Sequence, residues 1–384
     1  MDRSELSTGK SFYFYLSLMS NIKAKNPIMT NSLVYDTDLA YVYDPVDTVT
    51  IVKWQYLLVA VCLFLVSLSP LPLYGSSPAL IQKYDENTVR AVLIDELPDL
   101  DIDTVVLITA GWDNLVADIN DEWIFRFPRV EEFLQTLERE QLLLKYLQNR
   151  VSLPVPLYKY IGLRTAFVGY RKIFGEALNE KVYLSYSVGI RQKIADSLAL
   201  FLTQFHHAVS VEDALELGYK EYHLPLQWIE HNLFGTFPSN EIERIIGEAL
   251  LYTKQNPCST KNLVLLHNDL HGGNLAFDVK TAQVTGIFDF SDAAIGDYSV
   301  EFGKLFSIHP DLAIRTSKAY ASLNDVADPI LPAAVDYILR RALYILHTRE
   351  CGGDVSRENN LVQILQDFVP VWEDLQSARK VKID

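Results

Sequence analysis

Along the chain, hydrophobic and polar positions first alternate in short runs and later recur with a helical period. Alternation with a period of two predicts strands, whereas apolar residues three and four positions apart predict helices. Strands are expected at Val105–Thr109, Leu115–Ile119, Glu122–Phe127, Leu157–Ile161 and Thr165–Tyr170, and helices at Ala79–Leu93, Val130–Gln148 and Ser187–His206. The second and third strands meet at Asn120-Asp121, turn residues that indicate a hairpin. The pattern therefore predicts a small group of strands followed by long helices.

Two charged residues interrupt apolar faces in this region. Arg126 lies on the third strand, on the face opposite to Trp123, Phe125 and Phe127. Glu140 falls on the apolar stripe of the following helix, where another leucine is expected. Burial of a lone carboxylate is costly, so Glu140 requires a cationic or hydrogen-bonding partner.

The stretch from residue 264 to residue 297 is the most informative part of the sequence. Its apolar runs predict strands at Leu263–Leu266, Leu275–Phe277 and Gln283–Phe288. The last two strands form a hairpin that starts and finishes at one end, so Asn274 and Asp289 are expected side by side. Asp269 lies on the adjoining loop, HNDLHGGN at 267–274, next to a Gly-Gly pair that is expected to be flexible.

Carboxylate and amide oxygens in this arrangement suit Mg²⁺, which takes one or two carboxylates and leaves other positions for water and phosphate oxygens. With Asn274 and Asp289 as ligands, Asp269 remains to orient or deprotonate a substrate hydroxyl. The spacing His-x-Asp-x-x-x-x-Asn, followed by an aspartate at a strand end, matches the catalytic loop and metal-binding aspartate of kinases. An alternative is a zinc site formed by His267, Asp269 and His271, although no further His or Cys cluster supports it.

These motifs resemble those of the aminoglycoside phosphotransferase family, which are small-molecule kinases with a protein-kinase-like fold. The family's loop, often HGDLHPGN, reads HNDLHGGN here, and its Asp-Phe-Ser/Gly-Asp-Ala run reads DFSDA at 289–293. Upstream, GWDNLVADINDEWIFRFPR at 111–129 resembles the nucleotide-covering hairpin, and FVGYRKIFGEAL at 167–178 resembles the hinge between lobes. The motifs follow the family order over roughly residues 95–305.

The resemblance implies an α+β, two-lobed protein-kinase-like fold. A small N-lobe with an antiparallel sheet would span residues 79–170, and a larger, mainly helical C-lobe would span residues 171–384. The catalytic base would be Asp269, with Asn274 and Asp289 as magnesium ligands. Nucleotide-binding roles would fall on the pair Arg126 and Glu140 and on the backbone of Tyr170, Arg171 and Lys172. The implied function is transfer of the γ-phosphate of ATP or GTP to a hydroxyl of a small molecule.

Three positions depart from the family pattern. Arg126 stands where many kinases carry lysine, the turn at 109–114 holds one glycine, and Asn268 stands where glycine is common. Arginine replaces the charge of lysine but not its geometry. No Ala-Pro-Glu anchor follows the loop, which argues against a protein substrate. An aminoglycoside or other amino-bearing acceptor would suit the acidic residues where relatives insert substrate helices, namely Asp213, Glu216, Glu221 and Glu230.

Composition narrows the setting. The chain has 384 residues, 49% of them apolar, and a net charge of −15, so a large globular protein is expected. The acidic balance argues against general nucleic-acid binding, which needs a dense basic surface. Three scattered cysteines without a CxxC pair fit a reducing, cytoplasmic compartment.

The first 78 residues differ from the rest. Residues 56–68 form an almost unbroken apolar run, which extends to residue 73 if Leu71 and Leu73 are counted. A spanning helix needs about 20 apolar residues, so three interpretations stay open: a membrane anchor, a buried helix, or an extension outside the working domain. Together with the departures above, this run leaves an alternative to the enzyme, a catalytically silent, membrane-tethered nucleotide-binding module.

Overall fold

The computed structural model describes residues 79–81, 85–109, 113–233, 235, 237 and 239–381. By its contacts the chain divides into two compact units, and residues 80–384 belong to one of them. The apolar run at 56–73 and the other expectations for residues 1–78 lie outside the described residues. Within the described ranges, no helix is long and apolar enough to cross a membrane.

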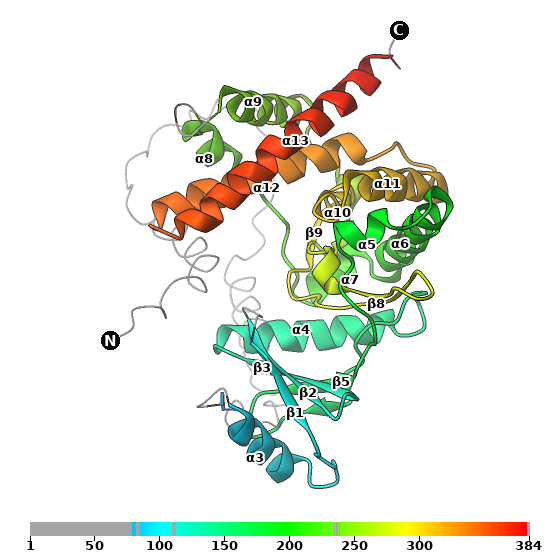
Figure 1. Ribbon diagram of the computed structural model, residues 1–384, viewed down its shortest axis with the longest axis vertical. Coiled ribbons are helices and arrows are strands. Elements are labelled where there is room, and N and C mark those ends of the chain that lie inside the picture. The colour runs from blue at the N-terminus through cyan, green and yellow to red at the C-terminus, as the bar shows by residue number, and fades with distance from the viewer. Residues whose placement is uncertain are drawn as a thin grey trace, which may run out of the picture. The chain divides into compact units, whose positions relative to one another are not determined.

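The N-terminal part of this unit is a five-stranded antiparallel sheet in the order β1-β2-β3-β5-β4 (Figure 1). Its strands are β1 Val105–Ile108, β2 Asn114–Ile119, β3 Trp123–Pro128, β4 Tyr160–Ile161 and β5 Val168–Arg171. The expected hairpin joins β2 to β3, and both Asn120 and Asp121 adopt positive φ angles, 59° and 55°. Strand β4 is shorter than the expected Leu157–Ile161, although the Lys159 N–H just before it still donates to the Gly169 carbonyl at 2.8 Å.

Helix α3, Glu86–Glu96, packs against one face of this sheet. The side chains of Trp123, Phe125 and Phe127 share a buried core with it, as their common strand face predicts. The helix begins later than the expected Ala79–Leu93, because the side chain of Asp85 accepts the Thr88 N–H at 2.9 Å and caps it there.

Helix α4, Glu132–Leu147, packs on the face that carries Arg126. Its buried positions include Leu137, Glu140, Leu144 and Leu147, which is the stripe predicted from the helical period. Leu144 and Leu147 also belong to the core of the C-terminal part. Helix α4 therefore carries Glu140 to the boundary between the sheet and the helical part.

The C-terminal part is mostly helical, with two short two-stranded sheets (Figure 1). Its strands are β6 Leu263–Leu266, β7 Leu275–Asp278, β8 Gln283–Ile287 and β9 Ala294–Asp297. Its helices are α5 Glu180–Leu184, α6 Val188–Ala208, α7 Val211–Glu216, α8 Leu226–His231, α9 Asn240–Gln255, α10 Val300–Leu305, α11 Pro310–Asn324, α12 Ile330–Glu350 and α13 Val355–Val381. Helices α9, α12 and α13 pack on one another, and α6 packs on α11.

The two short sheets hold both ends of the loop at 267–274. Strand β6 leads into the loop and pairs with β9, while β7 leads out and pairs with β8. The Phe288 N–H donates to the Asn274 carbonyl at 3.2 Å, so Asn274 and Asp289 are neighbours, as predicted. The expectation of a flexible Gly-Gly pair is wrong for Gly272, because this residue is buried and a Cβ added there would collide with the Leu178 carbonyl oxygen.

Candidate active site

The loop at 267–274 is held from within by His267 and from outside by Glu301 of α10. His267 Nδ1 accepts the Asp269 N–H at 3.3 Å, and its Nε2 lies 3.2 Å from the Phe288 carbonyl oxygen, to which it donates. The fully buried carboxylate of Glu301 accepts the N–H groups of both His267 and Asn268 on one oxygen. The loop backbone is therefore fixed by hydrogen bonds on both sides.

The zinc interpretation of the loop fails on these contacts. Both ring nitrogens of His267 are already used, so His267 has none left for a metal. The described part of the chain also contains no group of three or more His, Cys, Asp or Glu side chains placed to hold a metal ion.

The Asp269 carboxylate has a cation on one oxygen and an amide on the other. Lys304 Nζ lies 2.8 Å from Oδ1, Asn274 Nδ2 lies 3.0 Å from Oδ2, and His271 Nε2 lies 3.5 Å from Oδ2. Burial alone would raise the pKa of Asp269, but the contacts with His271 and Lys304 outweigh burial and hold the pKa well below its usual range. Asp269 is therefore ionised at neutral pH and able to accept a hydrogen bond from a hydroxyl.

Asn274 and Asp289 each keep one oxygen for a ligand. Asn274 Nδ2 donates to the carbonyl and to Oδ2 of Asp269, which leaves its Oδ1 without a donor among the described residues. Asp289 accepts from Arg126 and Ser291 on Oδ1, at 3.2 and 2.7 Å, and no described group donates to its Oδ2. An amide oxygen and a carboxylate oxygen left open on adjacent segments fit the ligands that Mg²⁺ takes.

The predicted partnership of Arg126 and Glu140 is present as a buried ion pair. Arg126 Nη1 lies 2.9 and 2.8 Å from the two Glu140 oxygens, and Nη2 lies 3.2 Å from Asp289 Oδ1. Glu140 Oε1 also accepts the Phe290 N–H at 3.0 Å. Burial alone would lower the pKa of Arg126, but Glu140 and Tyr158 raise it above its ordinary value. The pair thus ties β3 and α4 to the segment that contains Asp289.

Two further carboxyl groups show that the site carries an excess of negative charge. Burial and the charge of Asp289 raise the pKa of Asp113, just before β2, to about 6. Crowding by the surrounding protein and the charge of Asp269 raise the pKa of Asp292 to about 7, although Asp292 is exposed at the surface, which weakens the effect of crowding. A divalent cation bound among these groups would relieve their repulsion, so the electrostatics agree with the open oxygens.

Tyr170, Arg171 and Lys172 lie where β5 ends and the link to the C-terminal part begins. The Lys172 N–H donates to the Glu122 carbonyl at 2.8 Å, so it is not available to the adenine or guanine of a nucleotide. The prediction that this segment binds the nucleobase therefore rests on its other backbone groups.

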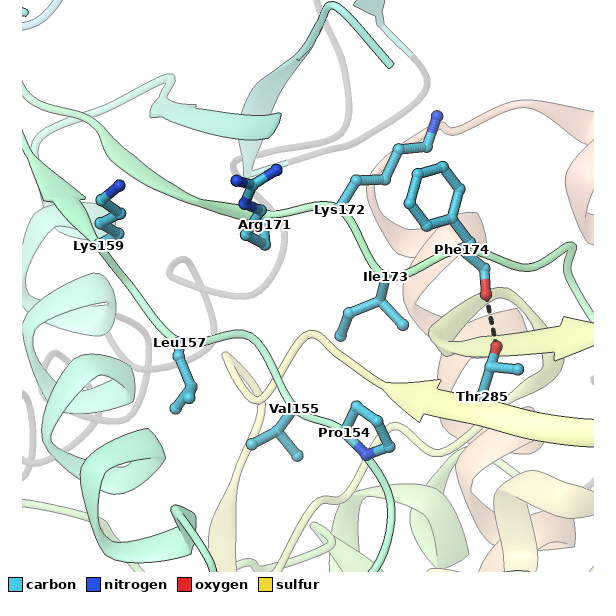
Figure 2. Close-up of a pocket in the computed structure, with 9 residues that line it drawn as sticks. All are labelled: Pro154, Val155, Leu157, Lys159, Arg171, Lys172, Ile173, Phe174 and Thr285. Atoms are coloured by element: carbon cyan, nitrogen blue, oxygen red, sulfur yellow. Dashed lines mark hydrogen bonds between the residues drawn. The ribbon is translucent and has the colours of Figure 1, made fainter. Parts of the chain in front are cut away.

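The side chains of Arg171 and Lys172 border a pocket of about 510 Å³ beside this link (Figure 2). Arg171 pairs with Glu122, and Lys172 pairs with Asp118 and Asp121. The pocket is lined by Pro154, Val155, Leu157, Lys159, Arg171, Lys172, Ile173, Phe174 and Thr285. Asp269, Asn274 and Asp289 do not line it, so the pocket does not include the candidate catalytic side chains.

Two contacts at the site were missed by the sequence analysis. Lys304 follows Asp269 by 35 positions, and no motif links them. Arg340 of α12 donates to Asn268 Oδ1 at 3.0 Å, while Asn268 Nδ2 donates to the Asp292 carbonyl at 2.9 Å. The available signal was Asn268 itself, since asparagine tolerates the left-handed conformation, φ 64°, that it adopts in place of the usual glycine.

The sheet, the α4 glutamate and the loop followed by a strand-terminal aspartate define a kinase-like class of protein. Residues 104–330 match the model of the phosphotransferase enzyme family, which is more than half of the 384 residues. The chain therefore belongs to this family, and the resemblance inferred from the motifs is confirmed.

Solved structures of similar fold agree with this class. The GDP complex of wild-type aminoglycoside 2'-phosphotransferase-IIIa matches with a TM-score of 0.66 and 23% identity, over 74% of this chain and 99% of that one. The gentamicin complex of APH(2")-IIa matches with a TM-score of 0.54 and 18% identity, over 73% and 96%. Macrolide 2'-phosphotransferase MphH from Brachybacterium faecium matches with a TM-score of 0.52 and 19% identity, over 72% and 97%. At these identities the matches establish the two-part kinase-like fold.

Proposed function

We propose that this chain transfers the γ-phosphate of ATP or GTP, bound with Mg²⁺, to a hydroxyl of a small molecule. The observation that carries the proposal is the convergence of Asp269, Asn274 and Asp289, the last two each with an open oxygen. This donor set suits Mg²⁺, which supplies electrostatic stabilisation of phosphoryl oxygens when it is bound. Structural neighbours described as complexes of GDP, ADP and ATP support a nucleotide as the phosphate donor.

Within this proposal, Asp269 orients the acceptor hydroxyl and receives its proton. Because the pKa of Asp269 lies well below its usual range, it takes the proton only late, as the hydroxyl oxygen bonds to phosphorus and becomes acidic. Arg126 contacts Asp289 and adds positive charge on the phosphate side, while Glu140 fixes the guanidinium in place.

An amino-bearing acceptor is the substrate class that the charges favour. Crowding by the surrounding protein and, after it, the charge of Asp269 raise the pKa of Asp292, and an ammonium group bound there would offset the charge part of this effect. Two of the acidic residues expected to face such a substrate have local partners instead, since Asp213 accepts from Ser210 and Glu230 pairs with Lys254. Structural neighbours described with gentamicin and streptomycin support an aminoglycoside acceptor, whereas the neighbour described as a macrolide phosphotransferase supports a different scaffold.

The first test is thermal melting of the full-length chain with ATP or GTP, with and without Mg²⁺. A ligand that binds only the folded state raises Tm, so one nucleotide should raise it in a magnesium-dependent manner. Asp289→Ala should remove the rise, whereas Asp367→Ala, at an exposed position of α13, should retain it. No rise with either nucleotide would contradict the proposal and favour a silent module.

The second test is turnover of the chain that shows this rise, measured across amino sugars, macrolides and choline-like alcohols. Phosphorylation of at least one aminoglycoside or other free amino sugar is expected. Turnover of macrolides alone would keep the phosphotransferase proposal but exclude aminoglycosides as the substrates.

A further inference from the structure

Helix α10 places a lysine directly on the candidate catalytic base. Lys304 Nζ lies 2.8 Å from Asp269 Oδ1, and the Lys304 side chain is only 11% exposed. Asp269 is 22% exposed, so the pair is sheltered but remains open to a ligand on one side. Glu301, Phe302 and Leu305 on the same helix are fully buried. Helix α10 is therefore firmly packed where it carries Lys304.

The ammonium group of Lys304 has N–H donors that its contacts in the described structure do not use. An ammonium group has three N–H donors, and among the described residues Asp269 Oδ1 is the acceptor that Lys304 Nζ contacts. Lys304 is partly buried rather than fully buried, so its unused donors remain available to water or to a ligand. Phosphoryl oxygens are strong acceptors, and charge-assisted hydrogen bonds to them are about twice as strong as neutral ones.

A purely structural role does not account for this lysine. The Asp269 side chain is already held by Asn274 Nδ2, and its backbone N–H is held by His267 Nδ1. The loop backbone is separately anchored by Glu301, which lies on the same helix as Lys304. The loop therefore keeps its anchors without Lys304, and what the lysine adds is positive charge at the oxygen beside the reacting hydroxyl.

Resting on the proposed function, we propose that Lys304 is a catalytic residue whose ammonium group contacts the γ-phosphoryl group both in the bound triphosphate and during its transfer. A hydroxyl held by Asp269 brings its oxygen within about 3–3.5 Å of the γ-phosphorus. The γ-phosphoryl oxygens then lie within reach of a lysine side chain that contacts the same carboxylate. Lys304 thus bridges the base and the phosphoryl group from α10, an element outside the loop and hairpin that carry the other candidate groups.

The transfer step balances without any further reactant. The acceptor oxygen forms a bond to the γ-phosphorus, and the bond from that phosphorus to the β–γ bridging oxygen breaks. The bridging oxygen keeps the electron pair and leaves as the nucleoside diphosphate, while the hydroxyl proton passes to Asp269. Lys304 remains protonated throughout and donates hydrogen bonds to the γ-phosphoryl oxygens, where negative charge is spread in the transition state.

The test compares Lys304→Met and Lys304→Arg with Lys318→Met, which removes an exposed lysine of α11. Calorimetric titration of the full-length chains with the magnesium complexes of ATP, GTP, ADP and GDP gives the preference for triphosphate over diphosphate. Lys304→Met should reduce this preference about tenfold or more, because only the triphosphate carries the oxygens that Lys304 contacts. Lys304→Arg, which keeps the charge, should reduce it less, and Lys318→Met should leave it unchanged.

Hydrolysis of the bound triphosphate by water provides a second measurement that needs no identified acceptor. Removal of one donor to the transition state typically lowers kcat about 10²–10³-fold, and Lys304→Met should fall in this range without a matching rise in KM. The rate ratio between the triphosphate and its γ-thio analogue should also be smaller in Lys304→Met, since sulfur accepts the lost hydrogen bond poorly. A merely structural lysine would leave that ratio unchanged.

These outcomes separate the two proposals. If the wild-type chain binds a triphosphate with magnesium and Lys304→Met keeps the wild-type triphosphate preference, the role of Lys304 is overturned while the phosphotransferase function stands. If the wild-type chain binds neither triphosphate, the proposed function fails, and the role of Lys304 fails with it.

Discussion

Asp269 is the residue on which the proposed chemistry depends most directly. Asp269→Asn keeps the shape of the side chain but removes the acceptor for the hydroxyl proton. Loss of a general base typically lowers turnover about 10²–10⁴-fold, so transfer should fall in this range. Magnesium-dependent stabilisation by nucleotide should persist, because Asn274 and Asp289 keep their open oxygens. Steady-state kinetics measures the loss of transfer, and thermal melting measures the retained stabilisation by nucleotide. Near-wild-type turnover would show that the catalytic base has been assigned wrongly.

Asp292 allows a prediction of pH dependence at a single residue. Its pKa is raised to about 7 in the folded chain by crowding and by the charge of Asp269, against 3.8 ordinarily. Ionisation of Asp292 therefore destabilises the folded state. This destabilisation is complete above pH 7 and fades as the pH falls toward 4. Asp292→Asn should raise Tm at pH 8, and the gain should shrink progressively at pH 6 and pH 5. The melting series is run without nucleotide and magnesium, and a gain independent of pH would refute this explanation.

At the scale of elements, the Arg126–Glu140 pair joins a strand, a helix and the segment after Asp289. Breaking a buried ion pair by removing one partner typically costs about 3–5 kcal/mol, because the remaining charge is left buried without compensation. Glu140→Leu continues the leucine stripe of α4 but leaves Arg126 with only the weaker contact to Asp289, so it should lower the free energy of unfolding by up to that amount. Arg126→Met combined with Glu140→Leu should cost clearly less than the sum of the two single changes.

Urea unfolding of the two single variants and the double variant measures this coupling. The two single variants and the double variant should all have reduced transfer activity, because Glu140 also accepts the Phe290 N–H and Arg126 also contacts Asp289. Additive effects on stability would mean that the two side chains do not act as a buried pair.

Most of the elements, and the neighbourhood of Asn274 and Asp289, followed from local patterns in the sequence. The period-two and helical runs located β1 to β3 and α4, and the hairpin geometry brought Asn274 beside Asp289, because both depend on residues close together in the chain. The position of Lys304 on Asp269 depends instead on how α10 packs, and such a contact leaves no periodic trace. Gly272 was misjudged for the same reason, since its packing against Leu178 is a tertiary contact.

At the scale of the whole molecule, the structure connects the candidate catalytic loop to the C-terminal helices through Asn268 and Arg340. Arg340 of α12 is buried, donates to Asn268 Oδ1 at 3.0 Å and contacts Asp336 Oδ2 at 3.1 Å. Tyr222 completes this group, because its hydroxyl donates to Asp336 Oδ1 at 2.8 Å and its ring lies 4.5 Å from the guanidinium. Asparagine in place of the family's glycine therefore gives the loop a side-chain contact with α12.

A comparison of Asn268→Gly with Asn268→Ala tests this connection. Glycine adopts the φ angle of 64° without strain, whereas alanine in this conformation is destabilised by about 1–2 kcal/mol. Both substitutions remove the contact with Arg340. Asn268→Gly should thus retain magnesium-dependent nucleotide binding with a modest loss of stability, and Asn268→Ala should lose more stability.

Arg340→Met should be the most destabilising of these single changes, because it leaves the Asp336 carboxylate buried without its cation. In Asn268→Gly the same arginine substitution should cost less by about 0.5–3 kcal/mol, the usual coupling of residues in contact. Equal costs in the two backgrounds, measured by urea unfolding, would show that the loop and α12 are energetically independent.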